Sequence, residues 1–229
     1  MKKTLLFLSA LFLMLNPAVS NAGNFGVGFS ISDADLDTVG KEDVDTDGTT
    51  DATKTVGDTA TIGSFFAEYT IMGVKDSMFG LTLGVDLIPG EADISKRSVT
   101  QSSVKADPGT VVTGTNTVEG TLENAYTLYV QPGIVLGDST MIYGTIGYAS
   151  VDFKGKSTSI SHTNINSSQT LSGSKVGVGV KHVLNSGFFI KADYTETDFD
   201  VASFTTSNNT TATADLDMQS YGISVGKQF

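Results

Sequence analysis

Residues 78–88 read MFGLTLGVDLI, and this stretch decides the fold. Apolar side chains from Phe79 to Leu87 occupy every second position, and glycine, threonine or aspartate fills the positions between them. A period of two indicates a β-strand, because successive side chains of a strand point to opposite faces. An amphipathic helix would repeat its apolar residues every three or four positions, and that spacing is absent here.

The same alternation recurs along the chain. The first case covers Phe25 to Ile31, and the last ends the sequence at 216–229. The others are 61–71, 121–131, 141–151, 174–184 and 187–197. With 78–88, the sequence therefore predicts eight strands.

Long and short connections alternate between these strands. The long ones are 32–60, 89–120, 152–173 and 198–215, and the short ones are 72–77, 132–140 and 185–186. Alternate connections of an up-and-down barrel leave from opposite ends. We therefore predict an all-β fold, an eight-stranded antiparallel up-and-down barrel. Four long loops lie at one end, and the tight turns lie with both termini at the other.

The first residues are typical of a secretory signal peptide. Lys2 and Lys3 precede an apolar run at 5–15, and Ser20-Asn21-Ala22 is a small-residue cleavage pattern. The run is shorter than the ~20 residues that a membrane helix needs. We expect a signal peptide over 1–22, with an uncleaved anchor as the alternative, and one barrel domain over 23–229.

Composition excludes several classes of function. The domain after residue 22 carries 12 basic and 25 acidic residues, a net charge of −13, so we expect no nucleic-acid partner. Zero cysteines exclude a disulfide framework. No later segment is apolar enough for a membrane helix, so any insertion into a membrane must use strands.

A soluble barrel points its apolar face inward, whereas a membrane barrel points it at lipid. Here the other face is mainly glycine, serine and threonine with isolated charges, which suits a crowded interior better than a solvated exterior. Aromatic residues also fall near the strand ends, as membrane-interface girdles do. They are Phe25, Tyr69, Phe79, Phe188 and Phe229 toward the turn end and Tyr126, Tyr148 and Tyr194 toward the loop end. We favour the membrane barrel over a secreted soluble one.

The chain resembles the OmpA/OmpX-like family of eight-stranded outer-membrane barrels. The resemblance rests on 130–133 with 142–148, on 180–182 and 191–194, and on the terminal stretch 221–229. It implies that the membrane-assembly machinery reads the terminal strand, through Tyr221, Ile223, Val225 and Phe229. Lys227 interrupts that apolar face. No residues after Phe229 are available for the periplasmic peptidoglycan-binding domain of some members, so we do not transfer that role.

Six charged residues fall on the predicted inward face. They are Glu68, Asp86, Glu123, Lys181, Lys191 and Asp193. Charges in a narrow, dry interior must pair, because an isolated one costs several kcal/mol. The resemblance implies a network that closes the lumen and can act as a gate. We favour a static plug over a gated ion pathway, since eight strands enclose room for little more than side chains.

The first loop is acidic and partly fits a calcium-binding pattern. Asp43, Asp45, Asp47 and Asp51 occupy positions 1, 3, 5 and 9 of the EF-hand type loop, with Gly48 at position 6. Position 12 is Lys54, so the bidentate carboxylate is missing. The alternatives are a weak calcium site and a solvated acidic loop, and we favour the latter. No other cofactor is expected.

The two histidines are relevant to an alternative function as a lipid-modifying enzyme. Such an enzyme would need a serine and a histidine that another group orients. His162 lies in a Ser/Thr/Asn-rich loop without an evident orienting carboxylate, and His182 falls on the lipid-facing side near a turn. We expect no catalytic residues.

The sequence therefore predicts a monomeric, non-enzymatic outer-membrane barrel of a Gram-negative bacterium, exported through the periplasm. We expect an envelope-structural role and a surface role in adhesion or interaction. Its expected partners are outer-membrane lipid, lipopolysaccharide and the assembly machinery. The alternatives are a narrow porin-like channel and, with less support, a lipid-modifying enzyme.

Overall fold

The protein is a barrel of long strands, seen in a computed structural model that describes residues 24–43, 52–72, 78–107, 110–137, 139–158, 166–205 and 211–229. The strands are β1 (Asn24–Asp43), β2 (Ala52–Met72), β3 (Phe79–Asp107), β4 (Thr110–Leu136), β5 (Thr140–Thr158), β6 (Asn166–Val183), β7 (Phe188–Phe199), β8 (Ala202–Thr205) and β9 (Thr211–Gln228). In the part of the chain that the structure describes, no helix is long and apolar enough to cross a membrane.

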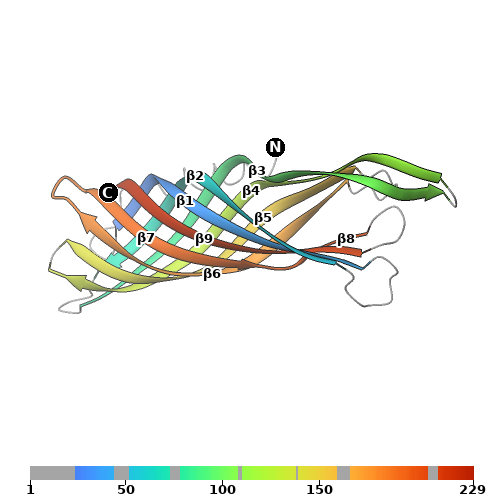
Figure 1. Cartoon of the computed structure of the whole chain (residues 1–229). Coiled ribbons are helices and arrows are strands. Elements are labelled where there is room, and N and C mark those ends of the chain that lie inside the picture. The colour runs from blue at the N-terminus through green and yellow to red at the C-terminus, as the bar shows by residue number, and fades with distance from the viewer. Residues whose placement is uncertain are drawn as a thin grey trace.

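From β1 to β7 each strand pairs antiparallel with the next, β9 pairs with β7, and β1 also pairs with β9, so the sheet closes on itself (Figure 1). Both β7 and β8 pair with β9, and only Asp200 and Val201 separate them. Counted as one interrupted strand, they make an eight-stranded barrel. The predicted fold class, strand count and strand order are confirmed.

The strands are much longer than the sequence analysis predicted. Most of each long connection continues as β-structure; between β1 and β2, for example, only 44–51 lie outside the described residues. The hairpin of β3 and β4 extends farthest (Figure 1). Asn24, where the described chain begins, and Phe229 lie at the opposite end with the short β4–β5 and β6–β7 connections, as predicted.

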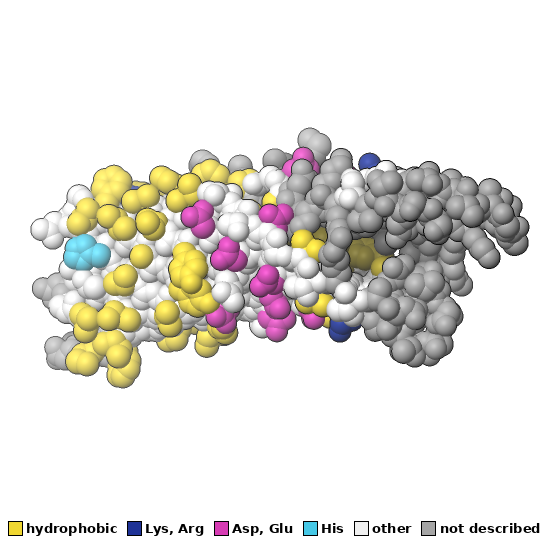
Figure 2. Space-filling model, viewed as in Figure 1, with side chains coloured by type: hydrophobic (Ala, Val, Ile, Leu, Met, Phe, Trp, Pro, Cys, Tyr) yellow, Lys and Arg dark blue, Asp and Glu magenta, His cyan; other side chains and the backbone are white. Residues whose placement is uncertain are grey.

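The inside–outside pattern of the barrel reverses part-way along its strands. Along β1 the outward side chains run Val27, Phe29 and Ile31 and then change to Asp33, Asp35 and Asp37. The inward ones run Gly28, Ser30 and Ser32 and then change to Ala34 and Leu36, which are buried. Figure 2 shows the result from outside, an apolar belt followed by a band of acidic side chains.

The other strands reverse at the same level. On β9 the outward row changes from Tyr221 to Gln219 and Asp217, and on β7 it changes from Tyr194 to Glu196. Tyrosine pairs mark the change, with ring centroids 4.9 Å apart for Tyr194 and Tyr221 and 6.5 Å apart for Tyr126 and Tyr148. We call the part with the apolar exterior the membrane segment: 24–32, 62–72, 79–87, 126–136, 140–148, 174–183, 188–195 and 220–228.

Beyond the tyrosines the barrel has an apolar core of its own. We call this part the outer barrel, made by the described residues of 33–61, 88–125, 149–173 and 196–219. Its buried cluster consists of Leu36, Ala149, Val151, Phe153, Leu171, Phe199, Ala202, Phe204 and Leu216. The rings of Phe153 and Phe204 lie 5.6 Å apart. The outer barrel therefore has the pattern of a soluble β-protein, apolar inside and polar outside.

Candidate functional site in the barrel lumen

A buried carboxylate with two lysines occupies the lumen of the membrane segment. Glu68 accepts hydrogen bonds from Lys181 Nζ at 2.7 Å and from Lys191 Nζ at 2.9 Å, one at each carboxylate oxygen. All three side chains are almost fully buried. We call Glu68, Lys181 and Lys191 the lumenal ion cluster.

Polar partners complete the hydrogen bonding of this cluster. Tyr129 Oη donates to Glu68 at 3.2 Å, Lys181 donates to Thr70 at 3.1 Å, and Lys191 donates to the Gln131 side-chain oxygen at 3.2 Å. Lys181 Nζ also lies 4.2 Å from the centroid of the Phe189 ring. A buried ion group is tolerated only when such partners satisfy its remaining donors and acceptors.

Aromatic rings fill the lumen around the cluster by lying on glycines of other strands. A Cβ added at Gly84 would meet the Tyr129 ring at 2.2 Å, and one at Gly226 would meet the Phe189 ring at 2.3 Å. Tyr143 covers Gly179 in the same way, at 2.6 Å. The glycines on this face therefore give space to the rings, and together rings and ion cluster close the lumen.

A small polar cavity of about 40 Å³ adjoins the cluster on the loop side. Its lining includes Asp86, Asp193, Lys175 and Lys191. One Asp86 oxygen is buried without a hydrogen-bond partner among the described residues. Because a water needs roughly 10–15 Å³, the cavity has room for about three or four waters.

Lys175 is a lumenal residue that the sequence analysis missed. It lies two positions before Gly177 on β6 and faces inward with Lys181. The same alternation that placed Lys181 inside was the signal that could have found it. With Lys175, the described inward ionisable groups of the membrane segment are three lysines and three carboxylates, equal in number.

The apolar core of the outer barrel lies beyond the cavity, toward the loops. A continuous pore would need both the lumenal ion cluster and this apolar core to open. Among the described residues, the lumen of the membrane segment is occupied by the ion cluster and the aromatic rings, next to a partly open cavity.

Glu123 is not part of the lumenal group, which corrects the sequence analysis. The β4–β5 register shifts between Glu123 and Tyr126, and Asn124 has a left-handed φ of 52°. A one-residue bulge exchanges the two faces of a strand, so before the bulge Leu122 packs on the apolar core and Glu123 turns outward. There it pairs with Lys154, whose side chain is half exposed, at 2.5 Å. Glu68, Asp86, Lys181, Lys191 and Asp193 do face the lumen.

The terminal strand carries its predicted apolar face outward. Tyr221, Ile223, Val225 and Phe229 are all exposed on the apolar belt, and the Phe229 N–H donates to the Phe25 carbonyl at 2.8 Å. Lys227, which interrupts the face, lies with its Nζ 4.6 Å from the Phe188 ring and donates to the Ser186 carbonyl. The lysine thus reaches the turn end of the belt, where water is close.

The remaining predicted residues lie mostly outside what the structure describes. Asp45, Asp47, Asp51 and His162 are outside the described residues, and Asp43 is the last residue of β1. Within the described part, no three acidic or histidine side chains are placed to hold a metal ion together. His182 is exposed near the turn end, with its Nδ1 2.9 Å from Thr140 Oγ1.

One known protein family matches nearly the whole chain. The model of the outer membrane protein beta-barrel domain matches residues 4–229. No curated protein matches the chain.

Solved structures similar to this chain include outer-membrane proteins of several bacteria. Ail, the attachment invasion locus protein of Yersinia pestis, is 15% identical over 92% of this chain and 100% of its own, with a TM-score of 0.49. The outer membrane protease OmpT from Escherichia coli is 9% identical over 90% and 97%, with a TM-score of 0.45. Neisserial surface protein A is 12% identical over 86% and 96%, with a TM-score of 0.33. Similarity this low carries no information on activity.

Proposed function

The chain belongs to the family of proteins with an outer membrane β-barrel domain, and we propose that it is a non-enzymatic member. It would contribute to the envelope and carry a folded outer barrel beyond the cell surface for adhesion or interaction. Export through the periplasm of a Gram-negative cell and a monomeric state belong to the same proposal. So do lipid, lipopolysaccharide and the assembly machinery as partners.

The observation that carries this proposal is the reversal of the inside–outside pattern. The apolar belt from Val27 to Ile31 suits lipid, and the acidic exterior from Asp33 onward suits water. A barrel that only spans the membrane has no need of a second apolar core. The outer barrel is therefore a structure built in water, and its surface is available to other molecules.

The closed lumen supports this role against the narrow channel. Solutes meet the ion cluster of Glu68, Lys181 and Lys191 from one end and the apolar core of the outer barrel from the other. We therefore expect no reproducible unitary conductance from the purified protein in planar bilayers. Regular single-channel steps would favour the channel and count against a surface role alone.

The absence of cysteine from the sequence allows a clean test of orientation. Thr59→Cys places a thiol on the outer barrel, and Ser186→Cys places one in the β6–β7 turn. We expect a membrane-impermeant maleimide to label Thr59→Cys on intact cells, and Ser186→Cys only after the outer membrane is permeabilised. The opposite labelling pattern would overturn the proposal.

A trimmed variant tests the surface role itself. Replacing 94–120 by Asn-Gly joins Asp93 to Thr121 through a two-residue hairpin turn. We expect it to insert normally, judged by a gel shift on boiling, while cells that carry it adhere less to epithelial monolayers than cells with the full chain. Equal adhesion with the full chain, the trimmed chain and no protein would reject the adhesive role. Detergent sensitivity of the same cells tests the envelope role separately.

A further inference from the structure

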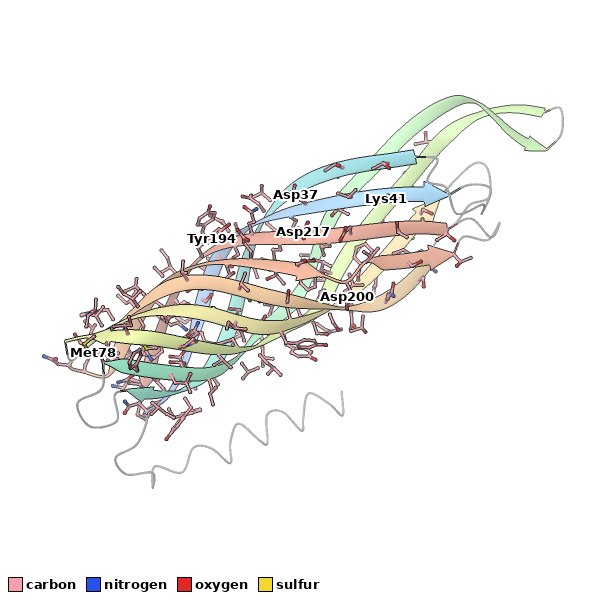
Figure 3. The ribbon with its side chains drawn as sticks, turned by 90° about the horizontal axis from the view of Figure 1, so that it is seen from below. Asp37, Lys41, Met78, Tyr194, Asp200 and Asp217 are labelled. Carbon is pink, nitrogen blue, oxygen red and sulfur yellow. The ribbon has the colours of Figure 1, made fainter. Side chains whose placement is uncertain are left out.

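The barrel wall is open between β2 and β3 in the outer barrel. Their ladder joins 65–72 to 80–87 and ends at the Phe65–Leu87 pair, yet β2 extends back to Ala52 and β3 continues to Asp107. Among the described residues, no strand pairs with the β3-facing edge of β2 over 52–64. Figure 3 shows the β3–β4 hairpin diverging from β1 and β2 at this end.

The two free edges differ in regularity. The β1–β2 ladder runs from Asn24–Thr70 to Glu42–Ala52 without a register shift, so the free edge of β2 is regular. The β3–β4 ladder has register shifts at four places beyond Ile88. Bulges blunt an edge against pairing with another chain, whereas a long regular edge is a template for it. The edge of β2 is therefore the one suited to accept a strand.

The backbone groups at this edge follow from the register. The Phe229 N–H donates to the Phe25 carbonyl, so odd-numbered residues of β1 bond to β9 and even-numbered ones bond to β2. Even residues of β1 pair with even residues of β2, which leaves the odd residues of β2 directed at the open edge. The Thr59 N–H accordingly donates at 2.9 Å to the carboxylate of Asp58 and not to β1.

Carboxylates of β1 contact their ladder partners on β2, the strand that carries this edge. Thr61 Oγ1 donates to Asp33 at 2.9 Å, and Thr59 Oγ1 donates to Asp35 at 3.1 Å. Asp37 Oδ1 lies 3.2 Å from the position that a Cβ on Gly57 would occupy. These exposed acids stand at every second residue, which is the spacing of side chains on one face of a strand.

We propose that the edge of β2 from Thr53 to Gly63 binds an extended, basic segment of another protein as an added strand. Backbone hydrogen bonds of the odd-numbered residues would hold the segment, and Asp33, Asp35 and Asp37 would select lysine or arginine at alternate positions. This inference rests on the proposed function, because the edge must lie outside the cell.

Other occupants fit the edge less well. The chain carries a net charge of −11, so a second copy would bring its own acidic surface against this one. Lipid is disfavoured because the outward side chains beside the edge are mainly threonines and aspartates, with Lys41 opposite Thr53 at its far end, beyond the end of the apolar belt. A basic polypeptide satisfies both the free backbone groups and the carboxylates.

The test uses the full-length protein in lipid nanodiscs and a synthetic peptide in which lysine alternates with valine. Its controls are a peptide with glutamate in place of lysine and a lysine–valine peptide of scrambled order. We expect the alternating lysine peptide to bind at least about ten-fold more tightly than either control. Amide hydrogen exchange should slow at Thr55, Gly57 and Thr61 when it binds.

A matched pair of variants separates strand addition from attraction by charge alone. Thr55→Pro removes one edge N–H, whereas Thr55→Val keeps that N–H and a β-branched side chain. We expect Thr55→Pro to weaken binding about ten-fold or more and Thr55→Val to leave it unchanged. The variant D33N/D35N/D37N should lose the preference for lysine over glutamate. Both Thr55 variants must retain the gel shift on boiling.

Two outcomes would overturn the inference. One is no binding of the lysine peptide. The other is binding that depends on the aspartates but is equal for Thr55→Pro and Thr55→Val, which would show attraction without strand pairing. If the peptide fails while Thr59→Cys is labelled on intact cells and the trimmed variant loses adhesion, the proposed function stands and only this inference fails.

Discussion

Asp37 and Asp217 are direct partners across the β1–β9 ladder, and both side chains are exposed on the outer barrel (Figure 3). Asp217 also lies opposite Asp198 of β7, so three carboxylates stand in one row across neighbouring strands. Like charges directly opposite each other destabilise a ladder. The barrel keeps this row on its water-facing side, where solvent and salt weaken the repulsion.

The acidic row predicts a pH effect at Asp217. Partial burial raises the pKa of Asp217 above its ordinary value of 3.8, and the carboxylates of Asp198, Asp215 and Asp37 raise it further. A raised pKa means that the folded state binds the proton more tightly than the unfolded state does. Stability at this site is therefore lost as the pH rises through the raised pKa.

Asp217→Asn should consequently be more stable than the wild type at neutral pH, by about a few tenths of a kcal/mol. The gain should vanish as the pH falls toward the ordinary carboxyl value and should shrink at high salt. Urea unfolding followed by circular dichroism measures it. Asp33→Asn is the control, because Asp33 has Tyr221 and Thr61 as ladder partners, and it should show no gain.

Removing the charge of Glu68 should destabilise the barrel strongly. Glu68→Gln removes the hydrogen-bonded counter-charge of the buried Lys181 and Lys191, and breaking a buried pair in this way typically costs about 3–5 kcal/mol. Glu123→Gln breaks a pair with the half-exposed Lys154 and should change little. Reversible unfolding in lipid vesicles compares the two. Equal effects would mean that the lumenal ion cluster is not a dry, coupled group.

The packing of rings on glycines predicts which glycines tolerate alanine. Gly226→Ala places a methyl group against the Phe189 ring and should cost about 1–3 kcal/mol. Gly144→Ala is the control, since its nearest neighbour lies 3.8 Å away. Combining Gly226→Ala with Phe189→Leu should recover part of the loss. A Gly226→Ala barrel as stable as the control would contradict the packing described above.

The absence of tryptophan allows the membrane boundary to be measured directly. Phe65→Trp lies on the apolar belt, two positions beyond the reversal on β2, and its fluorescence should be quenched by lipids with brominated chains. Asp198→Trp lies on the outer barrel and should resist that quenching while remaining open to iodide. Strong quenching of both tryptophans by brominated chains would place the boundary farther toward the loops than the tyrosines.

Alternation predicted the membrane segment because one face there is strongly apolar. It missed the outer barrel because the polarity of the two faces is exchanged. The sequence around Asp33, Ala34, Asp35, Leu36 and Asp37 still alternates, but its outward set is acidic, so its composition predicts an acidic loop. The period of two indicates that these residues form a strand, but hydrophobicity alone does not show which face points inward.

The lumenal residues were predictable as a face but not as a set of contacts. Glu68 and Lys181 lie 113 residues apart and meet only because the stagger between strands brings them to one level. No local pattern gives that stagger. The bulge at Asn124 was equally hidden, although asparagine is among the residues that most readily adopt a positive φ.

The reversal of polarity also restricts how barrels of this kind change in length. Inserting two residues into a strand of the outer barrel lengthens it and leaves every side chain on its proper face, whereas inserting one exchanges lipid-facing and core-facing positions along the rest of the strand. A single insertion is tolerated only with a compensating bulge like the one at Asn124. Hairpin height should therefore vary among relatives in steps of two residues per strand, while the distance from the tyrosines to the turns stays fixed by the thickness of the bilayer.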